Sequence, residues 1–212
     1  VEGETTFRSR RRAALTKEVR SQPGWELEET ENYFIISSSD DRQFLRELEQ
    51  RLEAIRKVYE GMYSIENADR FRLMANKRLN EARAKHEAES EDEEDGGAET
   101  GGSSMRTKTS GSTPMERSRC SVVRVCKSRG EYMEYGGPPG SAGYWSFMDE
   151  ELVIYDDQGG GGRRNTWATL HHEAFHQYIF YFYGNLSPHT WSNEGPGDFS
   201  SGYQLKARRF RS

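Results

Sequence analysis

Residues 166–183 read TWATLHHEAFHQYIFYFY, the clearest helix pattern in this chain of 212 residues. The segment contains neither glycine nor proline, Asn165 is a suitable N-cap, and Gly184 stands where a left-handed C-cap belongs. Apolar side chains occupy nearly every side of such a helix, which predicts that it is buried in the core. Polar groups inside it therefore need partners, because an unpaired buried polar group is costly.

Three of those polar groups belong to the pattern HEAFH at residues 172–176. Positions four apart share one face of a helix, so His172 and His176 can bind a single metal ion. Glu173 then lies beside that ion and can take a proton from a water molecule. Two histidines at this spacing with an adjacent glutamate are typical of zinc-dependent hydrolases, usually peptidases. We therefore expect one Zn²⁺ per chain.

A third zinc ligand is expected downstream, because catalytic zinc usually has three protein ligands and a water. The segment WSNEG at 191–195 offers Glu194, after enough chain for one helix to end and a second to begin. Asp198 follows four residues later, on the same face if the segment is helical, and can accept the free N–H of a ligand imidazole. His171 and His189 are better explained as a core residue and a loop residue.

HEAFH followed by W-x-NEG resembles the gluzincin metallopeptidases, and is especially similar to bacterial peptidase-like domains of unknown function with an HEA-x-HQ core. The resemblance covers residues 120–207 well and 24–63 loosely. It implies a zincin-like fold in which the HExxH helix is central and a following helix carries a ligand glutamate. It also implies one role for each motif residue: zinc ligand for His172, His176 and Glu194, general base for Glu173, and acceptor of a ligand imidazole N–H for Asp198.

The same resemblance implies that an extended substrate pairs with an edge strand, here formed by Tyr144, Trp145 and Ser146. The chain departs from the gluzincin pattern in two places. Gly195 and Gly197 weaken the helix expected at Glu194. In gluzincins a tyrosine or histidine from further downstream stabilises the tetrahedral intermediate, and Tyr203 is the local candidate for that role. Metal binding is thus better supported than turnover.

The rest of the chain predicts an α+β fold, with a small mixed or antiparallel sheet packed on helices. Residues 24–37 alternate and then become apolar, which indicates one or two strands. Apolar residues from Phe44 to Met62 recur at steps of three and four, so we expect an amphipathic helix that Asp40 or Asp41 can cap. Two further strand regions are expected: a short strand at 119–126 and a hairpin over 143–156.

Composition divides the chain into four parts. Residues 1–22 are rich in arginine and predict a flexible basic segment, and residues 23–86 supply the first strand and the amphipathic helices. Residues 87–116 are acidic and then rich in Gly and Ser, which predicts a disordered insertion. Residues 117–212 form the expected zincin-like metal-binding core, which we expect to continue beyond Ser212.

Overall composition excludes some partners. The formal net charge is −5, which gives no reason to expect nucleic acid. No apolar run approaches the roughly 18 residues of a membrane span. Cys120 and Cys126 flank a strand-like run and are too far apart along one strand for a disulfide, so we expect buried free thiols. Oligomeric state does not follow from these features, and both a cytoplasmic and an extracytoplasmic location stay open.

The pattern favours a zinc metallopeptidase that hydrolyses the amide bonds of a peptide or protein substrate, with Glu173 as general base. One alternative is a non-catalytic module or inactive peptidase homologue in which zinc stabilises the fold. A second alternative is an interaction scaffold built on the helices of 41–86 and the acidic insertion, with HEAFH incidental. Metal analysis of the purified protein separates the second alternative from the other two.

Overall fold

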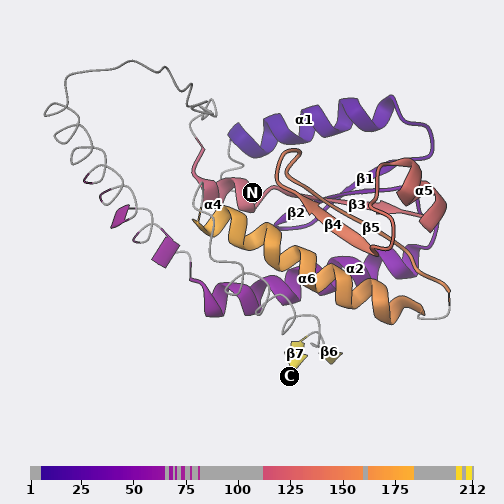
Figure 1. Cartoon of the computed structure of the whole chain (residues 1–212). Helices are drawn as coiled ribbons and strands as arrows, with labels where there is room; N and C mark the ends of the chain where they lie inside the picture. The colour runs from indigo at the N-terminus through magenta and orange to yellow at the C-terminus, as the bar shows by residue number, and fades with distance from the viewer. Residues whose placement is uncertain are drawn as a thin grey trace, which may run out of the picture.

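A mixed five-stranded sheet forms the centre of the computed structural model (Figure 1). The structure describes residues 6–64, 67–68, 70, 73–74, 77, 81, 112–159, 162–183, 204–206 and 209–211. Strand order is β1-β2-β3-β5-β4. The strands are β1 (Glu26–Glu29), β2 (Tyr33–Ser37), β3 (Ser121–Cys126), β4 (Gly143–Ser146) and β5 (Glu151–Tyr155). The three central strands are mutually parallel, and each outer strand is antiparallel to its neighbour.

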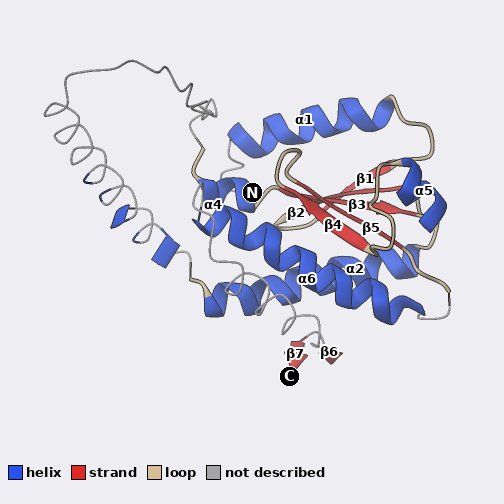
Figure 2. Ribbon diagram, viewed as in Figure 1, coloured by secondary structure: helices blue, strands red, loops and turns tan. Residues whose placement is uncertain are grey.

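Helices cover both faces of the sheet (Figure 2). On one face, α2 (Arg42–Met62) and α6 (Gly162–Tyr183) pack on alternate residues of the central strands. On the other face lie α1 (Thr6–Arg20) and the short α5 (Arg129–Glu134), while α4 (Pro114–Ser118) packs against α6 and α1. Strands buried on both faces are typical of parallel sheets covered by helices. The expected combination of a mixed sheet with helices is confirmed.

The amphipathic helix expected at residues 44–62 is α2, and its start is fixed by one of the two predicted caps. The Asp41 carboxylate accepts hydrogen bonds from the backbone N–H groups of Gln43 and Phe44, both at 2.9 Å. The apolar stripe of α2 is buried against α6. From that stripe, the Tyr59 hydroxyl donates a 2.5 Å hydrogen bond to the carbonyl of His171. This bond ties α2 directly to the HEAFH region of α6.

Helix α1 differs from the flexible segment that the composition of residues 1–22 predicts. Its apolar pattern is weak, but Leu15 is buried against the sheet. Arg8 donates to three backbone carbonyls of other segments: Thr30 at 2.6 Å, Arg119 at 2.7 Å and Glu31 at 3.0 Å. Long-range hydrogen bonds of this kind hold a helix that lacks a strong apolar face.

Helix α6 begins earlier than its sequence pattern predicts. It starts at Gly162, so Asn165 lies inside the helix instead of capping it. Arg163 anchors the new first turn, because its guanidinium binds Asp156 at 3.0 Å and Asp41 at 2.5 Å. The hydroxyl of Thr166 accepts a hydrogen bond from the backbone N–H of Asp157. The expected C-cap at Gly184 and a helix carrying Glu194 lie outside the described residues.

The remaining described elements agree with the local patterns. The hairpin expected over 143–156 is β4 and β5, and a second small hairpin joins β6 (Gln204–Lys206) to β7 (Arg209–Arg211). Both cysteines are buried free thiols. No described helix combines the length and apolar character that a bilayer crossing requires.

Candidate metal centre and adjoining groove

The two histidines of HEAFH converge on one point. Four residues apart on α6, His172 and His176 bring their Nε2 atoms to 2.9 Å of one another, with ring centroids 4.6 Å apart. Two nitrogen ligands of a tetrahedral zinc ion lie roughly 3.3 Å apart, given Zn–N bonds of about 2.0–2.1 Å. Both rings are half-buried, at a point where α6 reaches the surface of the domain. The pair therefore fits a shared cation with only a small adjustment of the rings.

Within the described part of the chain, no group of three His, Cys, Asp or Glu side chains forms a candidate metal site. The described residues supply two nitrogen donors, one fewer than catalytic zinc usually has. The other predicted site residues, Glu194, Asp198 and Tyr203, lie outside the described residues. His171 is fully buried, as expected for a core residue.

Glu173 shares a cavity with His172. This cavity has a volume of about 310 Å³ and is lined by Ser141, Ala142, Gly143, Ala168, Thr169, His172 and Glu173. The carboxylate of Glu173 also influences Tyr132: burial raises the pKa of Tyr132, and the negative charge of Glu173 adds to the rise. A carboxylate and an imidazole thus line the same space, which is large enough for part of a peptide.

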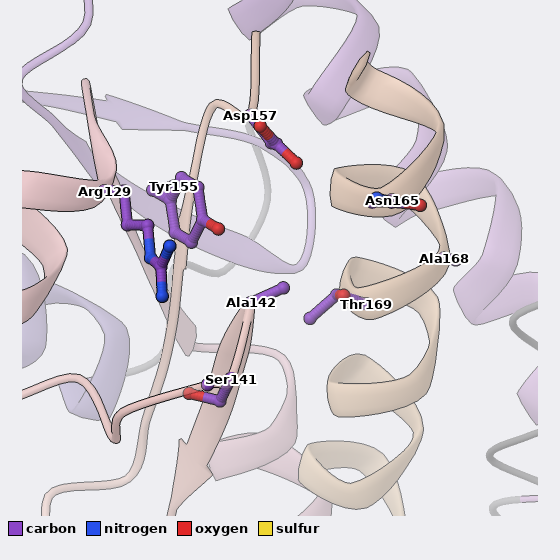
Figure 3. A pocket seen from close by; sticks show the side chains of 9 residues that line it. Arg129, Ser141, Ala142, Tyr155, Asp157, Asn165, Ala168 and Thr169 are labelled. Carbon is purple, nitrogen blue, oxygen red and sulfur yellow. The ribbon is translucent and has the colours of Figure 1, made fainter. Parts of the chain in front are cut away.

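A second cavity continues the first along α6. It has a volume of about 360 Å³ and shares Ser141, Ala142, Ala168 and Thr169 with its neighbour. Its further lining residues are Arg129, Gly140, Tyr155, Asp157 and Asn165 (Figure 3). We call the two cavities together the α6 groove. The groove runs from His172 and Glu173 toward the N-terminal end of α6.

The wall of the groove opposite α6 is held in place by hydroxyl groups and glycines. The hydroxyls of Tyr132 and Ser141 are 2.6 Å apart, and Ser141 also donates to the carbonyl of Pro138 at 2.8 Å. Gly137 packs so tightly on the Tyr132 ring that no Cβ could be accommodated there. The segment that leads into β4 is therefore fixed against α5, independently of α6.

Strand β4 lies at the edge of the five-stranded sheet. Its side chains are used for packing and turn formation: Tyr144 contacts Tyr132, Trp145 contacts Phe180 and Tyr181, and Ser146 donates to Asp149. The outer backbone edge has no strand partner among the described residues. Pairing of a substrate along residues 144–146 stays a prediction.

The residues at the far end of the groove were not among the predicted site residues. One signal was available: Asn165, Thr169 and Glu173 recur every four residues and so share one helix face. Arg129 and Tyr155 carried no such signal, because they come from α5 and β5 and reach the groove only through the tertiary fold.

Comparison of the chain with protein-family models, curated proteins and solved structures found no match. The functional argument therefore depends on the geometry of the site and on the chemistry of its residues.

Proposed function

We propose that this chain is a zinc-dependent metallopeptidase that hydrolyses peptide bonds, with Glu173 as general base. The observation that carries the proposal is the convergence of the His172 and His176 Nε2 atoms, 2.9 Å apart, beside a cavity that Glu173 also lines. The two imidazoles supply two of the usual three protein ligands of catalytic zinc, and the carboxylate supplies the base that metal-assisted hydrolysis requires.

Each residue has a proposed role. His172 and His176 would hold zinc together with Glu194, and Asp198 would accept an imidazole N–H and so orient that ring. When bound, zinc would make a water molecule more acidic and polarise the substrate carbonyl. The remaining roles belong to Glu173 and to a hydrogen-bond donor for the oxyanion, for which Tyr203 is the candidate.

The Glu173 carboxylate would accept one proton from the attacking water as the oxygen of that water bonds to the carbonyl carbon. The same carboxyl group would then return the proton to the amine nitrogen as the C–N bond breaks. The products are a carboxylic acid and an amine, and the base ends in the state in which it began. Thr169 and Gly143 line the cavity beside the base and would limit how the peptide approaches it.

The test measures zinc content and peptide cleavage on the same preparations. Glu173→Gln should keep zinc and lose most activity, whereas His172→Ala should lose both. Glu134→Gln is the matched control, because Glu134 is exposed on α5 and lines neither cavity of the groove. Undiminished cleavage by Glu173→Gln would exclude it as the base.

Two further results would redirect the proposal. Glu194→Ala should lower zinc retention, and full occupancy in that variant would mean that the third ligand lies elsewhere in the chain. Zinc at full occupancy without cleavage of any peptide would instead favour the alternative of a zinc-stabilised binding module.

A further inference from the structure

We propose that the Arg129 end of the α6 groove binds a carboxylate of the peptide substrate, at most about three or four residues from the cleaved bond. The inference rests on the proposed function for the nature of the substrate. It adds a binding subsite and a preference for acidic or free carboxyl ends to the peptidase reaction.

Arg129 is a cation that faces the cavity. Figure 3 shows its side chain alongside the Tyr155 ring, with the guanidinium toward Ser141 and with Asn165 and Thr169 of α6 on the opposite side. Within the described residues, Arg129 has no ion-pair or hydrogen-bond partner. The guanidinium offers a planar array of N–H donors that matches a carboxylate.

Two arginines with carboxylate partners show the contrast. Arg163 binds Asp41 and Asp156, and Arg124 binds Glu151 at 2.8 Å. Arg129 instead lines a cavity together with hydroxyl and amide side chains. Asp157 also lines this cavity, but it lies at the end away from Ser141 and Ala142, and its Oδ1 accepts the backbone N–H of Gly159 (Figure 3). A carboxylate ligand would therefore lie beside Arg129 on the Ser141 side.

The spacing along α6 sets the position of the subsite on the substrate. From Glu173 to Asn165 the helix rises about 12 Å, at about 1.5 Å per residue. An extended peptide covers that distance in about three or four residues, at about 3.3 Å each, which is the largest separation because Ser141 also lines the cavity of Glu173. The carboxylate bound at Arg129 is therefore not part of the bond that Glu173 would attack.

The direction of β4 favours a terminal carboxylate over a side chain. β4 runs in the same direction as α6, since Gly143 lies against Thr169 whereas Trp145 packs on Phe180 and Tyr181 farther along the helix. A peptide added antiparallel to β4 would thus point its carboxyl end toward Arg129. Antiparallel pairing is slightly more stable per residue than parallel pairing. An Asp or Glu side chain offers the same chemistry and is the second source to be tested.

The experiment measures binding in the absence of turnover. Three pools of randomised heptapeptides carry N-terminal fluorescein and end in a free carboxylate, a carboxamide, or a glutamate carboxamide. Fluorescence anisotropy is recorded with the full chain carrying Glu173→Gln, alone or combined with Arg129→Gln. The matched control is Arg164→Gln, which removes the same charge from an exposed α6 position outside both cavities.

We expect the free-carboxylate pool to bind about tenfold more tightly than the carboxamide pool, because a charge-assisted hydrogen-bond pair is lost in the latter. Arg129→Gln should abolish this preference, and Arg164→Gln should retain it. If the glutamate carboxamide pool binds as tightly as the free-carboxylate pool, the subsite would be assigned to an acidic side chain. No binding, no carboxylate preference, or a preference that survives Arg129→Gln would overturn the proposal.

Cleavage by the protein with Glu173 intact separates the two hypotheses. Cleavage that does not depend on Arg129 or on the carboxyl end would leave the peptidase proposal standing and overturn the subsite. Arg129-dependent binding without zinc and without cleavage would leave the carboxylate subsite standing and overturn the peptidase. Arg129 is exposed, so we expect its variant to fold, and circular dichroism verifies this.

Discussion

Replacement of Gly143 by alanine should destabilise the protein by about 1–3 kcal/mol, the usual effect of adding a methyl group to a packed site. A Cβ at this position would lie 2.8 Å from Cγ2 of both Ile154 and Thr169, and 2.9 Å from the Val153 carbonyl oxygen. Ordinary carbon contacts are about 3.5–4.0 Å, so β4 would have to move by about 1 Å relative to both α6 and β5. Rotation of the two side chains cannot relieve the contact with the backbone carbonyl.

Urea denaturation followed by circular dichroism measures this loss, and two further variants locate its origin. Thr169→Ser removes one of the two methyl groups, so it should recover part of the stability when combined with Gly143→Ala. Gly130→Ala is the matched control: its new Cβ would meet only the Ser128 hydroxyl oxygen at 3.7 Å, an ordinary contact, so we expect no loss of stability. A Gly143→Ala protein as stable as the parent, or one that Thr169→Ser does not improve, would refute the close approach of β4 to α6.

The same variant tests the link between groove and activity. Gly143 and Thr169 line the cavity that also contains Glu173. If the peptidase proposal holds, a shift of about 1 Å in this wall should lower kcat/KM by roughly a hundredfold. Retained zinc in the same protein would show that the loss comes from the groove and not from the metal centre.

Four other predictions concern the core. Arg124→Met should lower the free energy of unfolding by about 3–5 kcal/mol, because it leaves the buried Glu151 carboxylate without its 2.8 Å guanidinium partner. Adding Glu151→Leu to the same chain should recover much of that stability, as measured by urea denaturation. Burial raises the pKa of Glu151, so the folded state holds this proton more tightly than the unfolded chain. The contribution of Glu151 to stability is complete below pH 4.5 and is lost as the pH rises. Arg124→Met should make that loss larger, as measured by denaturation at a series of increasing pH values. Burial also raises the pKa of Cys126 to about 12. Iodoacetamide at pH 8 should therefore leave this thiol unmodified until denaturant is added, and mass spectrometry measures the modification. Tyr59→Phe should lower the free energy of unfolding by about 1 kcal/mol, because the 2.5 Å hydrogen bond to the His171 carbonyl is lost, and an unchanged midpoint in urea would contradict that role.

Elements with a strong local pattern could be predicted from the sequence. The apolar period and the Asp41 cap of α2 are both properties of one short segment, and both are present. The hairpin of β4 and β5 follows for the same reason. Helix α1 could not be predicted, because its position depends on bonds from Arg8 to carbonyls that are distant in the sequence. The sequence of residues 6–20 alone does not indicate those hydrogen-bond partners.

The parallel arrangement of the central strands was only partly visible. YFIIS at 33–37 and ELVIY at 151–155 are nearly continuous apolar runs, a signature of strands buried on both faces. The sequence analysis left mixed and antiparallel sheets open, because strand order depends on how α2 and the segment between β3 and β5 cross the sheet. The observed register aligns Ile35, Val123 and Leu152, which face α2 and α6, whereas Phe34 and Val122 pair on the opposite face of the sheet.

The candidate site likewise has one part that follows from local sequence and one part that depends on the tertiary fold. The metal-binding pair is a local property, because spacing along one helix brings the His172 and His176 nitrogens together wherever α6 lies. The groove is a tertiary property, because its opposite wall comes from α5 and from the segment that enters β4. Variants on that wall, such as Arg129→Gln, should therefore change peptide binding and leave zinc content unaltered. His172→Ala should remove zinc and leave carboxylate binding at the far end of the groove intact. If both measurements always change together, the metal centre and the groove do not act as separate parts of one site.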